Sequence, residues 1–194
     1  FGVLPGEVLL GYVGRVTPEK NIGVLLDGFM RVLSSASQVV KLMIVGGDAS
    51  DLTQIRQYAS RLGIPEDRLI LTGRVPYNDV HLYYAAMDMF VTASYSEVQP
   101  MTFAEALGCS LPIVAFDVPG CNDMVEDGNN GMLVGLEQGS LGLAYAILKL
   151  LNNQQERVAM RSRAQRWSKR YDASAAIPRM LDAYELARIL YLGH

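Results

Sequence analysis

Two basic residues stand at positions where an enzyme could use them. Arg15 and Lys20 are five positions apart, directly after Gly14 and before an apolar pattern with helical spacing. A helix start offers free N–H groups and a partial positive charge, so a guanidinium and an ammonium beside it could hold a diphosphate. Two solvated loop cations would give the same pattern, and the spacing alone leaves both interpretations open.

Two acids, Glu97 and Glu105, have seven residues between them. The apolar run at 87–94 predicts a buried strand, and 100–109 predicts a helix with Pro100 at its first position. Glu97 therefore falls beyond the carboxyl end of a strand and faces the helix start, while Glu105 projects from the helix and could accept hydrogen bonds from a ribose diol. The alternative is ordinary, because acids near a helix start are favoured by the helix dipole.

The elements that must position these residues alternate between strands and helices over the first 135 residues. Apolar runs bounded by glycine or polar residues predict strands at 7–14, 39–47, 68–73, 87–94, 111–116 and at the end of 117–134. Helices are predicted at 21–36, 51–63, 76–87, 100–109, 139–152, 154–170 and 173–190. This alternation predicts an α/β fold with a doubly wound, six-stranded parallel sheet and a helical C-terminal cap. Such sheets bind ligands beyond the carboxyl ends of their strands.

Length and composition limit the class of protein. With 194 residues, half of them apolar, and a net charge of −3, the chain can build one good core and lacks the basic surplus of a nucleic-acid binder. Cys109 and Cys121 are too few for a disulfide framework, are not spaced as a metal knuckle, and favour a reducing, cytoplasmic setting. No apolar run reaches the roughly 18 residues of a spanning helix. The start at Phe1 leads us to expect a piece of a longer protein.

Three motifs, in order and at matching separations, resemble the C-terminal domain of the family-4, or group 1, retaining glycosyltransferases of the GT-B fold. The family shows G-R-x(4)-K-N at its first helix, E-x(7)-E around the start of its central helix, and G-x-P-[VI]-[VI]-A in the next strand. The matching positions are Gly14, Arg15, Lys20, Asn21, Glu97, Glu105 and 111–115. The resemblance spans almost the whole chain and implies a Rossmann-like donor-binding domain at 1–170. It also implies that a helix at 171–194 packs toward an N-terminal acceptor domain outside this segment.

The resemblance assigns roles residue by residue. Arg15 and Lys20 would hold the diphosphate of a nucleotide-sugar donor and stabilise the charge that grows as the bond to the sugar breaks. Glu105 would hold the ribose hydroxyls, and Glu97 the sugar near its transferring carbon. The resemblance places the loop at Gly73, Arg74 and Val75 beside the base. The other implied donor contacts are Gly14, Gln99, Met101 and Thr102.

The chemistry that the resemblance implies is simple. The leaving phosphate takes the proton of the acceptor, so no protein nucleophile is needed. No cofactor or metal is implied either, since the chain has no Asp-x-Asp pair and no cluster of His and Cys.

Two segments depart from the family pattern. At 97–101 the family commonly has E-G-F-G-L, whereas this chain has Glu-Val-Gln-Pro-Met, so Pro100 removes a backbone donor. Some members that act on lipid acceptors carry a similar variant, and we expect the change to tune the site. The segment 108–110, Gly-Cys-Ser, also replaces the usual A-x-G.

The resemblance therefore predicts transfer of a hexose from a UDP-, GDP- or ADP-sugar to a glycan or lipid-linked acceptor, in bacterial lipopolysaccharide, capsule or glycolipid synthesis. The isolated domain should bind nucleotide but transfer little. Two alternatives stay open. One is a GT-B sugar-nucleotide 2-epimerase, which should need further acid and histidine residues. The other is a non-catalytic doubly wound regulatory or binding module, which would carry acids after the first strand, where this chain has Gly14 and Arg15.

Other polar residues are weaker candidates. His81 lies at helical spacing beside Tyr84 and is expected at the surface. Asp123 could cap a turn, or lie near the donor sugar, where the family often has a loop acid. A basic helix carries Trp167 and is by default a solvated face, with contact to anionic lipid headgroups on the inner side of the plasma membrane as the alternative. Its cations are Arg157, Arg161, Arg163, Arg166, Lys169 and Arg170.

Overall fold

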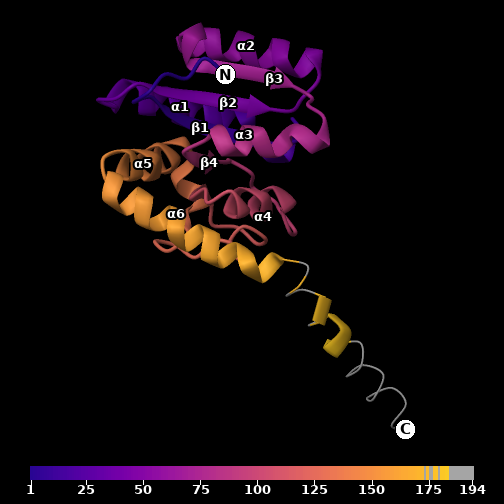
Figure 1. Cartoon of the computed structure of the whole chain (residues 1–194). Helices are drawn as coiled ribbons and strands as arrows, with labels where there is room; N and C mark the ends of the chain where they lie inside the picture. The colour runs from indigo at the N-terminus through magenta and orange to yellow at the C-terminus, as the bar shows by residue number, and fades with distance from the viewer. Residues whose placement is uncertain (173, 175–176, 179, 184–194) are drawn as a thin grey trace.

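The computed structural model describes residues 1–172, 174, 177–178 and 180–183. At its centre lies a six-stranded sheet in which neighbouring strands are parallel, in the order β3-β2-β1-β4-β5-β6 (Figure 1). All residues of β1 and β2 are buried, as expected of parallel strands covered on both faces. The predicted doubly wound, six-stranded parallel sheet is therefore confirmed. The strands are β1 (Val8–Val13), β2 (Val40–Val45), β3 (Leu69–Gly73), β4 (Met89–Val91), β5 (Ile113–Phe116) and β6 (Gly131–Val134).

Helices cover both faces of the sheet. Helix α1 packs against α2 and α5, while α4 packs against α3 and α6. In Figure 1, α6 crosses the lower part of the molecule from α5 toward α4, which gives the expected helical C-terminal cap. The α-helices of the described residues are α1 (Ile22–Ser35), α2 (Ala49–Leu62), α3 (Val80–Ala86), α4 (Met101–Gly108), α5 (Gly139–Leu151) and α6 (Gln154–Ser168).

The strand order reverses between β1 and β4. From β1 the chain moves outward through β2 and β3, and it then returns to β4 on the other side of β1. The loops after β1 and β4 therefore border a shared crevice, which is the place where open α/β sheets bind ligands. Arg15 follows β1 and Glu97 follows β4, so the topology brings their loops together.

A cluster of four buried aromatic side chains packs beneath this crevice, in the core of the protein. Phe90 lies at its centre, with its ring centroid 6.5 Å from that of Tyr12, 6.1 Å from Tyr84 and 5.8 Å from Phe103. All four side chains are at most 2% exposed. Because they come from β1, β4, α3 and α4, their contacts fix the positions of these four elements relative to one another.

The bounds of strand β4 and of helix α4 both differ from the predicted ones. The strand predicted at 87–94 extends only over Met89–Val91, and the buried hydroxyls of Thr92 and Ser94 beyond it bond to each other at 3.1 Å. The helix predicted at 100–109 begins one residue later, because Pro100 has extended backbone angles and stands at the N-cap. The prediction that Pro100 occupies the first helical position is wrong, although its missing N–H still costs the helix nothing.

The C-terminal part of the prediction is described only in part. A 3-10 turn at Lys169–Tyr171 follows α6, and residues 174, 177–178 and 180–183 are helical. The rest of the helix predicted at 173–190, and the packing expected of 171–194, lie outside the described residues. No helix in the described part of the chain is both long and apolar enough to cross a membrane.

The start of α2 should make the stability of the fold depend on pH. The Asp48 carboxylate accepts the N–H groups of Ser50 and Asp51 at 2.9 and 3.0 Å, and the Asp51 carboxylate accepts the Asp48 N–H at 2.8 Å. The Ser50 hydroxyl, followed by the Asp51 N–H, lowers the pKa of Asp48. A carboxyl whose pKa is lowered by folding stabilises the fold above its unfolded pKa, about 3.9, and this contribution is lost as the pH falls through the folded pKa.

We therefore expect Asp48→Asn to flatten the fall in unfolding free energy below about pH 4, as measured by urea titrations at a series of pH values. Asparagine remains a good N-cap, so the variant should still fold. Asp79 is a matched control, because it stands at the N-cap of α3 without a side-chain cap bond. An equal flattening in Asp79→Asn would contradict the assignment to the Asp48 cap.

Candidate functional site

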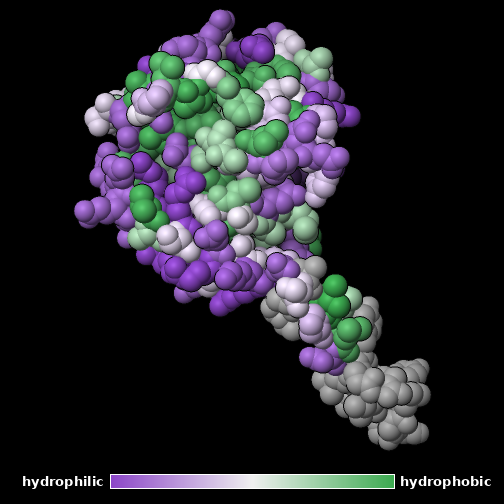
Figure 2. Space-filling view, viewed as in Figure 1, coloured by the Kyte–Doolittle hydropathy of each residue, from purple (hydrophilic) through white to green (hydrophobic). Residues whose placement is uncertain are grey.

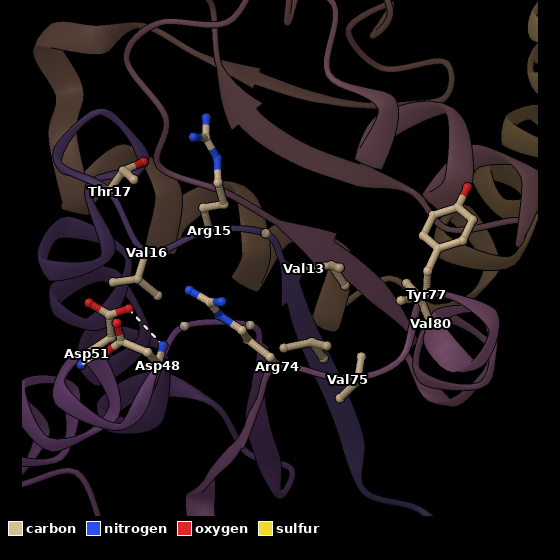
Figure 3. A pocket seen from close by; sticks show the side chains of 14 residues that line it. Val13, Arg15, Val16, Thr17, Asp48, Asp51, Arg74, Val75, Tyr77 and Val80 are labelled. Carbon is tan, nitrogen blue, oxygen red and sulfur yellow. Dashed lines mark hydrogen bonds between the residues drawn. The ribbon is translucent and has the colours of Figure 1, made fainter.

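Three adjoining hollows lie at the carboxyl ends of the strands. The large cleft, of about 750 Å³, lies between the loops that follow β1, β2 and β3 (Figure 3). The central pocket, of about 430 Å³, lies between the loops that follow β1 and β4. The side pocket, of about 400 Å³, lies between α3 and α4. The large cleft shares Val13, Gly14 and Arg15 with the central pocket, and it shares Tyr77 and Val80 with the side pocket.

The central pocket joins a cation and an acid that are far apart in sequence. The Lys20 ammonium donates to the Glu97 carboxylate at 2.5 Å, and the two side chains are only 17% and 11% exposed. The Tyr95 N–H donates to the Glu19 carbonyl at 3.1 Å, which ties the loop after β4 to the turn that carries Lys20. A shielded pair of this kind is screened by salt less than a surface pair. Lys20 and Glu97 therefore present two opposite charges at a defined place in the pocket.

The start of α1 lies next to Lys20 and can bind an anion. Lys20 ends the 3-10 turn Pro18–Lys20, and Asn21 has the left-handed conformation, with φ of 52°, that leads the chain into α1. The Asn21 side chain does not cap the helix. The first N–H groups of α1 can therefore donate to a negatively charged ligand, and the helix dipole favours one.

Arg15 and Arg74 bring two guanidinium groups to the large cleft. The Arg15 side chain is 80% exposed and lies 4.0 Å from the Glu19 carboxylate. Figure 3 shows Arg74 directed toward the side of the cleft that holds Asp48 and Asp51, while Arg15 points away from it. Exposed ion pairs are weak, so Arg15 can turn to an anion in the adjoining central pocket at little cost.

Glu105 lies in the side pocket and is absent from the lining of the central pocket. The buried Tyr84 hydroxyl donates to its carboxylate at 2.9 Å. Burial, followed by the charge of Glu105, raises the pKa of Tyr84, so this hydroxyl stays protonated and remains a donor. The sequence analysis placed Glu97 and Glu105 over one crevice, whereas the structure places them in separate pockets that the large cleft connects.

We expect Tyr84→Phe to lower the unfolding free energy by about 1.5 kcal/mol, because the charged Glu105 carboxylate then loses the hydrogen bond that the buried Tyr84 hydroxyl donates to it. The measurement is urea denaturation followed by circular dichroism. Tyr58→Phe is the matched control, since the Tyr58 hydroxyl donates to Asp27 at the same distance, 2.9 Å, in a more exposed setting. The control should lose less, and a larger loss in Tyr58→Phe would show that the Tyr84 bond adds little.

The other residues predicted for a donor site fall into two groups. Gly73 is buried and lines none of the three hollows, and Gln99 is exposed and also lines none of them. The rest line the large cleft or the central pocket, and their contact with a donor stays a prediction. These are Gly14, Arg74, Val75, Met101 and Thr102.

Some residues of the hollows did not stand out in the sequence. Tyr77 is 79% exposed, although it is aromatic, and it lines both the large cleft and the side pocket. Its position just after the Gly73–Val75 loop is the one signal that could have identified it. Cys121 is fully buried, and burial, followed by the charge of Glu97, raises the pKa of its thiol to about 12. The turn that carries Cys121 thus borders the Lys20–Glu97 pair.

The weaker candidates take ordinary places. His81 is exposed, as predicted, and lies on the lining of the side pocket. The Asp123 carboxylate accepts the Gly120 N–H at 3.3 Å, which is the role of a turn cap. In the described part of the chain, no group of three or more His, Cys, Asp or Glu side chains could hold a metal ion. Independence from metal stays a prediction.

Several cations of the predicted basic helix make packing contacts, among them Arg170, which lies over the Trp167 ring. Arg157 donates to carbonyl groups at the end of α5, and Arg161 donates to the Met87 carbonyl. Arg163 donates to the Asn129 carbonyl in the loop before β6. Hydrophilic residues gather over α6 (Figure 2), but Arg157, Arg161 and Arg163 are half-buried and not part of a fully solvated face. Contact of the helix with anionic lipid stays a prediction.

Comparisons with known sequences identify the family of the chain. The model of the family "Glycosyl transferases group 1" matches residues 7–153. Alpha-monoglucosyldiacylglycerol synthase of Streptococcus pneumoniae is 35% identical over 151 residues, which are 78% of this chain and 33% of that protein. D-inositol 3-phosphate glycosyltransferase of Nocardia farcinica is 33% identical over 139 residues, which are 69% of this chain and 31% of that protein. The chain thus spans a minor part of the length of both relatives.

Solved structures share the fold. Anabaena Alr3699/HepE in complex with UDP superposes with a TM-score of 0.81 at 25% identity, over 93% of this chain and 49% of that one. Sucrose-phosphate synthase from Thermosynechococcus elongatus superposes with a TM-score of 0.82 at 25% identity, over 98% of this chain and 47% of that one. The expected likeness to a Rossmann-like half of a GT-B enzyme is confirmed. Since the family match covers far more than half of the sequence, the chain belongs to the group 1 glycosyl transferases.

Proposed function

We propose that this chain is the donor-binding domain of a retaining glycosyltransferase, which transfers a hexose from a nucleotide sugar to a glycan or lipid-linked acceptor. The observation that carries the proposal is the Lys20–Glu97 pair, which lies between the ends of β1 and β4 with Arg15 and the start of α1 beside it. Few ligands need two cations, helix N–H groups and an acid in one pocket. A diphosphate joined to a sugar is such a ligand, because its phosphates need the positive charges and its sugar hydroxyls can donate to the acid.

The cationic side of the central pocket would take the diphosphate. Lys20 supplies a compact ammonium charge, Arg15 supplies a guanidinium that can bind two oxygens, and the start of α1 supplies N–H donors. These groups would surround the diphosphate while the bond between the anomeric carbon and the phosphate oxygen breaks. They therefore stabilise the charge that develops on the leaving diphosphate.

The acids would bind the two sugars of the donor. Glu97, which lies in the central pocket beside Lys20, would accept hydrogen bonds from hydroxyls of the transferred hexose. Glu105 would accept them from the ribose, with Tyr84 holding its carboxylate in place. The base would lie in the large cleft against Val75, next to the exposed ring of Tyr77.

The reaction itself would use the donor's own phosphate as the base. The acceptor oxygen forms its bond to the anomeric carbon on the face that the phosphate leaves, and its proton passes to a phosphate oxygen. This step needs neither a protein nucleophile nor a metal. The acceptor site would belong to a further domain, and the segment 171–194 would pack toward it.

What related proteins bind and make supports this proposal. Alr3699/HepE has been solved in complex with UDP-glucose, and the relative from Streptococcus pneumoniae is a synthase of a glucosylated diacylglycerol. A uridine nucleotide and a lipid-linked acceptor are therefore sensible first probes. We place the protein in the cytoplasm, in bacterial envelope polysaccharide or glycolipid synthesis.

The test is calorimetric titration of the chain with UDP, GDP and ADP. We expect saturable binding of one of the three nucleotides, with weak or no binding of the other two. Equal and undetectable heats for all three would remove the donor site from this domain.

A further inference from the structure

A third loop at this end of the sheet touches the loop that carries Glu97. It connects β5 to β6, and Gly120 lies at its tightest point with φ of +82°. A Cβ built on Gly120 would lie 2.5 Å from the carbonyl oxygen of Glu97 and 2.8 Å from that of Val98. Real Cβ atoms essentially never come within 3.0 Å of a heavy atom outside their own residue and its two chain neighbours. The backbone of the Glu97 loop therefore rests directly on the Cα of Gly120.

The turn around Gly120 is well fastened. The Gly120 N–H donates to the Asp123 carboxylate at 3.3 Å, and the Cys121 N–H donates to the Val118 carbonyl at 3.0 Å. The Val125 N–H donates in turn to the Cys121 carbonyl at 2.9 Å. Cys121 is fully buried, so the turn is also anchored in the core. The Gly120 turn is therefore held by its own hydrogen bonds as well as by the core.

The opposite side of the Glu97 loop is held as well. The Tyr95 N–H bonds to the Glu19 carbonyl, and the Glu97 carboxylate bonds to Lys20. The loop is thus clamped between the turn that ends at Lys20 and the turn at Gly120. The distance between these two turns decides where the Glu97 carboxylate lies in the central pocket.

We propose that Gly120 is a positioning residue, which sets the place of the Glu97 carboxylate opposite Lys20 by letting the Glu97 backbone lie against its Cα. The inference rests on the proposed function only for its consequence, the binding of the donor sugar. A side chain at position 120 pushes the Glu97 backbone outward by about 0.5 Å or more, which is the tolerance that binding sites allow. Misplacement of that order lengthens the Lys20–Glu97 contact from 2.5 Å and weakens both this ion pair and sugar binding.

The first experiment needs no ligand. The coupling between Lys20 and Glu97 is measured as a double-mutant cycle in unfolding free energy, with Lys20→Met and Glu97→Gln, in three backgrounds. The backgrounds are the wild-type chain, Gly120→Ala and Gly128→Ala. Gly128 is the matched control, because it has a similar φ of +74° and an added Cβ would meet nothing within 4 Å. Both glycine variants suffer the same backbone strain, but only Gly120→Ala moves Glu97.

We expect the coupling to be weaker in Gly120→Ala than in the wild-type chain and unchanged in Gly128→Ala. Equal coupling in the two backgrounds overturns the inference. If Gly120→Ala does not fold, Asp123→Ala decides, because it frees the Gly120 N–H and loosens the turn without adding a clash. A weakened coupling in Asp123→Ala then supports the inference, and an unchanged coupling overturns it.

The second experiment uses UDP and UDP-glucose as probes in calorimetry. In Gly120→Ala we expect UDP to bind as it does to wild type, and UDP-glucose to lose about tenfold in affinity relative to UDP. In Gly128→Ala both affinities should be unchanged. If the wild-type chain binds neither probe, the proposed function fails for uridine donors, while the coupling experiment still decides the role of Gly120.

Discussion

Lys20→Ala is expected to reduce the affinity of the chain for its nucleoside diphosphate by at least about 100-fold, which corresponds to about 2.7 kcal/mol. The reason is the position of the ammonium. It is shielded from water, it lies beside the start of α1, and Glu97 holds it in place at 2.5 Å. A cation that is already fixed and partly desolvated loses little entropy or hydration when an anion arrives, so its loss removes most of what it contributes.

Calorimetry with the nucleotide that binds wild type best measures this loss. Lys149→Ala is the matched control, because it removes the same charge from an exposed position in the last turn of α5. It should change the affinity by less than about twofold, since distant surface charges are screened. The variant Lys20→Ala also leaves the Glu97 carboxylate without its partner, and we expect a lower melting temperature. Retained affinity in Lys20→Ala would show that the anion lies elsewhere.

The architecture was predictable because it depends on local patterns. Short apolar runs separated by amphipathic segments are sufficient to indicate parallel strands and covering helices, and the order of the sheet then follows from the usual crossovers. Pro100 illustrates the limit of this approach. Its chemistry indicates that a helix starts near it, but whether Pro100 stands inside or just before the helix depends on its backbone angles.

The contacts of the site were harder to predict, because they join residues that are distant in sequence. The motifs placed Lys20 and Glu97 near each other, but nothing local indicates that they form a direct ion pair across 77 positions. Glu105 pairs with Tyr84, a core aromatic whose hydroxyl could have bonded to many groups. The same limit applies to α6. A run of arginines looks solvated in the sequence, and only the folded chain shows the carbonyl groups that three of them reach.

Gly120 shows a further kind of information that a sequence hides. A glycine in a loop indicates a turn, and a positive φ is by itself a sufficient reason for glycine at such a position. That a second loop lies against its Cα becomes visible only when the two loops are seen together. A glycine can therefore be required by its neighbour as well as by its own backbone.

Glu97→Gln should act on the diphosphate in the direction opposite to Lys20→Ala. In the wild-type chain Lys20 donates to a carboxylate, and a diphosphate must share that ammonium with an acid of the same sign as itself. Glutamine has the same shape without the charge. It removes both the competition for Lys20 and the repulsion across the pocket, and we expect the nucleoside diphosphate to bind about tenfold more tightly.

The nucleotide sugar should respond differently from the diphosphate. If Glu97 holds hydroxyls of the hexose, the glutamine variant loses a charged acceptor, which is worth about 1.5 kcal/mol or more. UDP-glucose should then gain no affinity while UDP gains, so the ratio of the two affinities falls by about tenfold. Calorimetry with both compounds measures this ratio.

Glu19→Gln is the control for a general effect of charge. Glu19 lies in the same turn as Lys20, but its side chain is 35% exposed and bonds to the Thr17 hydroxyl. Removing its charge should change neither affinity by more than about twofold, because its pair with the 80% exposed Arg15 is weak. Equal tightening of UDP in the Glu19 and Glu97 variants would mean that the pocket responds only to net charge. Weaker binding of UDP in Glu97→Gln would mean instead that the diphosphate needs the carboxylate to hold Lys20 in place, and the two side chains would then act on the diphosphate as one unit.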